Sequence, residues 1–112
     1  MTKDLKTYSS ATSKKSGKIQ LKHPAGKHAV RMDKEKYLLI RQAILKSLQG
    51  GRELSHKMLL QSVVEYFEKK QIVFEGSVEW FMESVKLDME AEGIIERISS
   101  QSMFLFRMDA LS

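Results

Sequence analysis

Three successive segments of this chain carry apolar residues at helical spacing, and two short runs of β-forming residues follow them. Residues 33–50 repeat apolar side chains every three or four positions, and residues 55–70 and 77–92 do the same. Such spacing predicts amphipathic helices, each of which must bury one face. The chain is therefore constrained to pack three helices around a shared core.

Residues that commonly cap helices mark the limits of these segments. Asp33 and Ser55 stand at the N-cap positions of the first two, and Gly76-Ser77 opens the third. Gly50-Gly51 and Gly93 follow the first and third segments, where glycine is favoured just past a helix C-terminus. Capping and periodicity thus predict the same three helices independently.

Two later runs, residues 94–98 and 103–108, are rich in β-branched and aromatic residues. Residues 99–102, Ser-Ser-Gln-Ser, separate them and predict a short hairpin loop. Near the N-terminus, residues 18–22 permit a short strand, and His23-Pro24-Ala25-Gly26 predicts a turn.

Three helices followed by a β-hairpin is the element order of a winged helix-turn-helix domain. Glu53-Leu54-Ser55 resembles the start of the second helix in such domains. The segment Asp-Met-Glu-Ala-Glu-Gly-Ile-Ile-Glu-Arg at residues 88–97 resembles their passage from the third helix into the wing. The resemblance predicts an α+β, mainly α, fold: a three-helix winged helix-turn-helix with a C-terminal β-hairpin as its wing.

A second resemblance covers roughly residues 19–108. Residues 19–27, the segment Val30-Arg31-Met32-Asp33 and Tyr37 resemble the N-terminal segment of an uncharacterised bacterial winged-helix-like domain family. Trp80 and the segment Val-Lys-Leu-Asp-Met-Glu-Ala-Glu-Gly-Ile-Ile at residues 85–95 also resemble that family, with Met where the family has Leu. This resemblance supports the fold and implies no catalytic residue.

Positive charge is concentrated near the N-terminus. Residues 1–36 hold ten Lys or Arg and three acidic residues, whereas residues 37–112 hold nine and eleven. Residues 1–17 also lack apolar periodicity, which predicts a disordered basic tail. A single domain is expected over residues 18–110. The net charge of +5 therefore comes from the tail and the segment after it.

The composition also excludes several classes of protein. The chain has no Cys, which rules out a disulfide scaffold, a thiolate zinc site and a Cys nucleophile. Its sequence contains no apolar run near the roughly 18–20 residues that span a bilayer, and its first residues lack the apolar core of a signal peptide. These features favour a cytoplasmic protein.

The charge pattern of the third helix opposes base reading by that helix. Residues 75–92 hold six acidic residues and one basic residue, and phosphate repels acidic side chains. We instead expect weak, salt-sensitive nucleic-acid binding by a basic arm, with the arginines beside the wing tip as further contacts. The alternative is a solubilising tail with no partner. The candidate contacts are Lys14, Lys15, Lys18, Lys22, Lys27, Arg31, Arg97 and Arg107.

The third helix carries a second stripe of large apolar residues, Trp80 and Leu87, away from its core face. If the hairpin covers this stripe, both are core residues. If it does not, they form a surface for a protein partner or a second copy of the chain. The acidic row beside them, Glu79, Glu83 and Glu90, would suit a basic partner, or it would be a solvated helix face.

No catalytic motif accompanies these features. The chain contains no Ser-His-Asp set, no phosphate-binding glycine loop and no His-Glu-x-x-His. His23, His28 and His56 lack the neighbouring ligands that a metal site needs. We therefore expect no enzyme, no metal, no cofactor and no small-molecule ligand.

Overall fold

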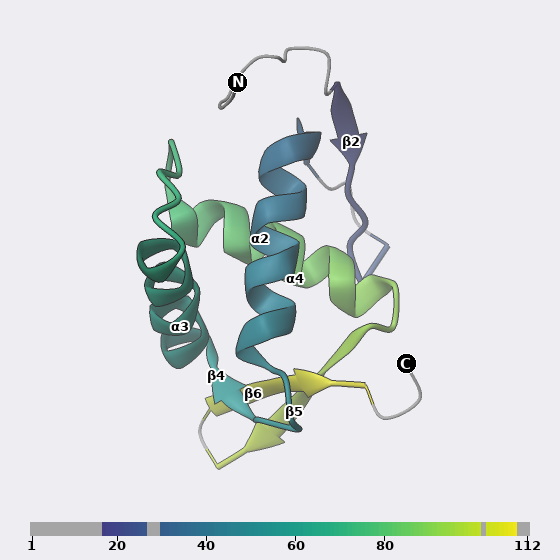
Figure 1. Cartoon of the computed structure of the whole chain (residues 1–112). Helices are drawn as coiled ribbons and strands as arrows, with labels where there is room; N and C mark the ends of the chain where they lie inside the picture. The colour runs from purple at the N-terminus through teal and green to yellow at the C-terminus, as the bar shows by residue number, and fades with distance from the viewer. Residues whose placement is uncertain (1–16, 27–29, 102, 110–112) are drawn as a thin grey trace.

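The computed structural model describes residues 17–26, 30–101 and 103–109 of the chain. This part contains three helices and five strands (Figure 1). The strands form two antiparallel sheets. The helices are α2 (Lys34–Ser47), α3 (His56–Lys69) and α4 (Val78–Ala91), and the strands are β2 (Lys18–Gln20), β3 (Arg31–Asp33), β4 (Leu54–Ser55), β5 (Ile95–Ser100) and β6 (Met103–Met108).

The expected winged helix-turn-helix with only a C-terminal hairpin is wrong. The strands β2 and β3 form a hairpin before the first helix, and β4 adds a third strand to the C-terminal sheet in the order β4-β6-β5. Both unexpected strands, β3 and β4, are three residues or shorter, so they carry no readable alternation. The register of β4, with Leu54 opposite Phe106, depends on a partner far along the chain.

The three helices begin where the sequence predicts. The side chain of Asp33 accepts a hydrogen bond from the N–H of Lys36, Ser55 from that of Met58, and Ser77 from that of Trp80. Each bond satisfies one of the N–H groups that a helix N-terminus leaves unpaired. The predicted N-caps are therefore confirmed.

In the C-terminal hairpin, β5 extends closer to the turn than the sequence predicts. Ser99 and Ser100 pair with Phe104 and Met103, so β5 includes two residues that were assigned to the loop. Serine is a weak strand former, and here the register with β6 outweighs its local preference.

The core lies between the helices and extends to both sheets. The helix α2 packs against both α3 and α4, and the three-stranded sheet closes one end of the helices (Figure 1). The side chains that are wholly inaccessible to solvent are Ile40, Ala43, Ile44, Leu48, Leu59, Val63, Met82, Val85 and Met89. They belong to the three stripes that helical periodicity predicts.

A buried carboxylate connects the N-terminal segment to two helices. Asp88 on α4 accepts hydrogen bonds from the backbone N–H of Lys22 at 2.8 Å and from the Tyr37 hydroxyl at 2.7 Å. Burial and this contact with Asp88 raise the pKa of Tyr37 to about 12. Lys22 also forms an ion pair with Glu92. The segment before α2 is therefore held by α4 through polar contacts as well as by its apolar residues.

An aromatic cluster lies where the segment after α3 reaches α4. The rings of Phe67 and Phe74 stack at 5.4 Å between centroids, and Phe74 meets Phe81 edge-on at 5.2 Å. Lys36 extends from α2 over the Phe81 ring at 5.2 Å and donates a hydrogen bond to the backbone carbonyl of Glu75 at 2.9 Å. This cluster fixes the chain just before α4.

Candidate functional site

A hollow of about 560 Å³ opens between the start of α3, the middle of α4 and the β5–β6 hairpin. Its lining combines cationic and aromatic side chains. The lining residues are Ser55, His56, Lys57, Glu83, Lys86, Arg97, Met103, Phe104 and Phe106.

Lys86 lies at the buried end of this hollow with only 2% of its surface exposed. Its Nζ atom is 3.0 Å from Glu83 Oε1, 3.0 Å from His56 Nδ1 and 4.0 Å from the centroid of the Phe106 ring. Burial lowers the pKa of the Lys86 ammonium, and the hydrogen bond to Glu83 opposes that shift. The three contacts offset the cost of burying the charge.

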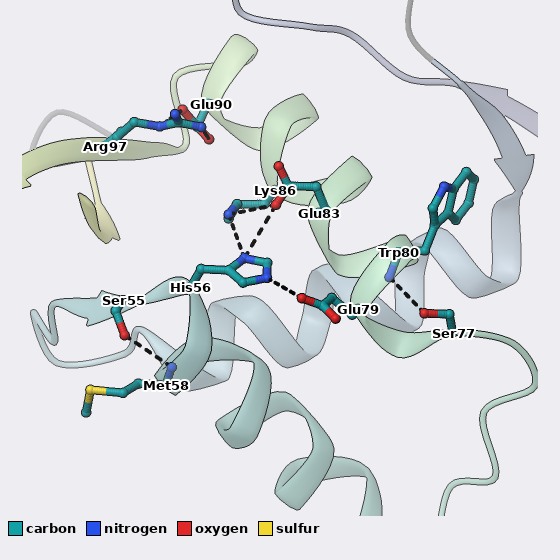
Figure 2. A network of polar contacts seen from close by, with 10 residues as sticks. All are labelled: Ser55, His56, Met58, Ser77, Glu79, Trp80, Glu83, Lys86, Glu90 and Arg97. Carbon is teal, nitrogen blue, oxygen red and sulfur yellow. Dashed lines mark hydrogen bonds and ion pairs between the residues drawn. The ribbon is translucent and has the colours of Figure 1, made fainter. Parts of the chain in front are cut away.

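His56 joins α3 to α4 through both of its ring nitrogens (Figure 2). Its Nδ1 accepts from the Lys86 ammonium, so its Nε2 carries the proton and donates to Glu79 Oε2 at 3.0 Å. Glu83 also lies 3.4 Å from Nδ1. The first residue of α3 is thus held to α4 by hydrogen bonds with Lys86 and Glu79.

Arg97 on β5 forms the wall of the hollow opposite α3. Its Nε and Nη2 donate to the two carboxylate oxygens of Glu90, at 3.2 and 3.1 Å. Its guanidinium also lies 5.1 Å from the centroid of the Phe104 ring and 5.3 Å from that of Phe106. Arg97 is therefore oriented by a bidentate ion pair and two aromatic rings.

The apolar part of the wall comes from β6. Phe106 is buried, whereas Met103 and Phe104 keep 54% and 50% of their surfaces exposed. Side chains of this size and polarity are usually covered in a small protein, so the rim of the hollow offers apolar surface.

Three of the predicted nucleic-acid contacts are occupied by carboxylates of the chain itself. Lys22 pairs with Glu92 and Arg97 with Glu90. Arg107 pairs with both Glu96 and Glu53. Lys18 and Arg31 are exposed on the β2–β3 hairpin. The described residues do not include Lys14, Lys15 or Lys27. They also do not include residues 1–16, which are nearly all of the predicted tail.

The predicted interface residues separate into two groups. Each member of the acidic row has a partner within the fold, because Glu79 contacts His56, Glu83 contacts Lys86 and Glu90 contacts Arg97. The side chains of Glu79 and Glu83 nevertheless stay 61% and 47% exposed, so binding of a basic partner by this row stays a prediction.

Trp80 points away from this network (Figure 2) and stays 48% exposed, with its ring edge-on to Phe81. Leu87 is half-buried. The hairpin thus does not bury Trp80, and the interface hypothesis stays a prediction that rests on this residue.

Sequence reasoning missed the hollow itself. In the sequence His56 is a candidate metal ligand, Lys86 is the one basic residue of an acidic helix, and Phe104 and Phe106 belong to a β-forming run. The available signal was the (i, i+3) spacing of Glu83 and Lys86 beside the core residues Met82 and Val85. That spacing identifies a partnered lysine, but it does not indicate which other elements reach it.

Across residues 17–26, 30–101 and 103–109, no group of three or more His, Cys, Asp or Glu is placed to hold a metal ion. Within the same ranges, none of the helices is both long and apolar enough to cross a bilayer.

The fold and the hollow define a small α+β protein with two antiparallel sheets. Residues 18–104 match the family of unknown function DUF6958, and the chain belongs to that family. Neither the curated proteins nor the solved structures gave a match. The family match indicates no activity and no relationship to winged helices.

Proposed function

We propose that this protein associates with nucleic acid without reading its sequence, through its basic N-terminal region. The observation that carries the proposal is the location of the charge. The described residues hold 14 Lys or Arg and 13 acidic residues, so the folded part is almost neutral. The remaining five Lys and one Asp lie within residues 1–16 and 27–29. Phosphate attraction would therefore act mainly through this region.

The β2–β3 hairpin continues this basic region into the fold. Ile19 pairs with Met32, which is buried, so this pair faces the core. Successive strand residues face opposite sides, which places Lys18 and Arg31 on the outer face of the hairpin, where they stand directly opposite Asp33 and Gln20. Both basic residues are exposed and neither forms an ion pair within the described ranges. Lys14 and Lys15 precede Lys18 closely in sequence.

Sequence-independent binding fits the remaining charges better than base reading does. Arg97 and Arg107, toward the open end of the β5–β6 hairpin, already donate to carboxylates. If these arginines turned toward a nucleic acid, Glu90 and Glu96 would lose their ion-pair partners. Base recognition needs donors that can face a groove edge, and these two arginines are committed elsewhere.

The hairpin makes the first testable contribution. Lys18→Gln together with Arg31→Gln should lower the slope of log K against log salt concentration by about 1 to 2, because each phosphate contact contributes about 0.9. The slope is measured by fluorescence anisotropy with a labelled duplex of arbitrary sequence. The matched control is Lys46→Gln with Lys69→Gln, which removes the same charge from exposed sites on α2 and α3. Equal slopes for the two double variants would remove the hairpin from the interface.

Residues 1–16 make the larger contribution to the proposed binding. Dissociation constants of about 10⁻⁴–10⁻⁶ M are expected for such binding at physiological salt. Deletion of residues 1–16 removes four lysines and should lower the salt slope by about 3. The full-length variant with these four lysines replaced by glutamine should behave like the deletion, because charge rather than length drives the binding.

Absence of binding to duplex and single-stranded DNA at low salt would refute the proposal. The competing function is then a protein-interaction module or homodimer that uses the exposed Trp80. Light scattering of the wild type and of Trp80→Ser would separate these outcomes, since only a Trp80-dependent dimer changes its mass in the variant.

A further inference from the structure

We propose that the hollow between α3, α4 and the β5–β6 hairpin binds a small organic carboxylate with an aromatic or apolar body. This site is separate from the basic N-terminal region and does not depend on nucleic-acid binding. Its residues come from three parts of the chain, residues 55–57, 83–97 and 103–106, which meet only in the folded protein.

The size and walls of the hollow suit a small ligand. Its volume of about 560 Å³ falls within the roughly 300–1,000 Å³ that small-molecule sites occupy. Phe104, Phe106 and Met103 supply a continuous apolar side, and two of these residues remain half-exposed. A ligand with an aromatic body would cover that surface and stack on Phe104.

The charge of the lining selects an anion. The hollow is lined by the cations Lys57, Lys86 and Arg97, and by a single carboxylate, Glu83. Two more carboxylates contact lining residues from outside the lining. Glu79 accepts a hydrogen bond from His56, and Glu90 accepts from Arg97. Lys86 is paired with Glu83 and Arg97 with Glu90, so Lys57 is the lining cation that has no carboxylate partner among the described residues.

Donors for a ligand carboxylate are present on opposite walls. Lys57 on α3 is exposed and forms no ion pair with any described residue. Arg97 uses Nε and Nη2 for Glu90, so its Nη1 lacks a partner among the described residues. Lys86 adds a fixed positive charge at the buried end, where lower effective permittivity strengthens attraction. A ligand carboxylate would accept from Lys57 or from Arg97 while the ligand body rests on the rings.

The test uses 2-naphthoate as the probe and the full-length, ¹⁵N-labelled protein. Titration followed by amide chemical shifts should give a dissociation constant below about 1 mM, which corresponds to a modest free energy of binding. The perturbed amides should be those of residues 55–57, 83–86, 97 and 103–106. The uncharged analogue 2-naphthamide should bind at least about tenfold more weakly, because it lacks the charge that the cations attract.

Variants separate the two recognition elements. Lys57→Gln should weaken 2-naphthoate at least about fivefold and leave 2-naphthamide unchanged, whereas Phe104→Ala should weaken both. Lys86→Met keeps the volume of the buried side chain and should weaken only the carboxylate. Lys69→Gln is the matched control on the far part of α3 and should change neither affinity. Amide spectra of each variant show that it has folded.

Three outcomes would overturn the proposal. The first is no chemical-shift change at millimolar 2-naphthoate. The second is equal affinity for the acid and the amide, which would show an apolar surface without anion selection. The third is perturbation confined to the β2–β3 hairpin or to the loop before α4.

Discussion

Asp88→Ala should lower the free energy of unfolding by about 3 kcal/mol, as is typical when one partner of a buried charged hydrogen-bond network is removed. The substitution leaves the Tyr37 hydroxyl and the Lys22 N–H without their acceptor. Tyr37 and Lys22 lie 51 and 66 residues from Asp88, so the carboxylate joins distant parts of the chain. Urea denaturation followed by far-UV circular dichroism measures the change.

The Tyr37 phenol provides a second measurement for the same variant. Burial, the hydrogen bond to Asp88 and the Asp88 charge raise its pKa to about 12 from the ordinary tyrosine value of 10.0. Loss of Asp88 removes the last two causes, so the pKa should fall and the tyrosinate absorbance should rise at lower pH. Because the folded pKa exceeds the unfolded one, the phenol contributes stability below about pH 10 that is lost between about pH 10 and 12. In Asp88→Ala this alkaline loss should be smaller.

Glu68→Ala is the control for Asp88, since Glu68 is an exposed acid on α3 and its side chain makes no hydrogen bond or ion pair within the described ranges. It should change stability by less than about 0.5 kcal/mol. A urea midpoint for Asp88→Ala that equals that of Glu68→Ala would contradict the role given to the buried carboxylate.

Gly76→Ala should cost about 2 kcal/mol of stability, within the range for strained backbone positions. Gly76 has a φ of +106°, well outside the conformations that alanine prefers. A Cβ atom there would also lie 3.1 Å from Cε2 of the Phe81 ring, which is held between Phe74, Trp80 and Lys36. Thermal and urea unfolding measure the loss, and Trp80 fluorescence reports local rearrangement.

Gly50→Ala is the matched control for Gly76. Gly50 also has a positive φ, of +81°, but nothing lies within 4 Å of the position of an added Cβ. Its substitution should cost about 1 kcal/mol from backbone strain alone. Phe81→Leu combined with Gly76→Ala should recover part of the difference, because it removes the ring that opposes the Cβ. Equal costs for the two glycines would show that the Phe81 contact contributes nothing.

The starts of the helices could be predicted because their signals are local. Asp33, Ser55 and Ser77 each cap a helix through the N–H of a residue three positions later. The apolar periodicity of each segment likewise depends only on the spacing of neighbours. The β3 and β4 strands could not be predicted, because each is defined by a partner and a register rather than by its own two or three residues.

The same distinction explains the candidate site. The sequence shows that α4 is acidic, but it does not show what those acids meet. In the structure Glu79 meets His56 from 23 residues earlier, and His56 meets Lys86 from 30 residues later. The acidic row that the sequence shows is therefore paired with His56, Lys86 and Arg97 beside the hollow.

By itself, the sequence determined the three helices, their caps and the concentration of positive charge near the N-terminus, because these follow from residue identity and local spacing. Only the tertiary structure decided that β4 joins the C-terminal sheet, that Trp80 stays exposed, and that Lys86, Arg97 and Phe104 line one hollow. These features depend on contacts between residues far apart in the chain, and such contacts are set by packing of the whole core rather than by any local pattern.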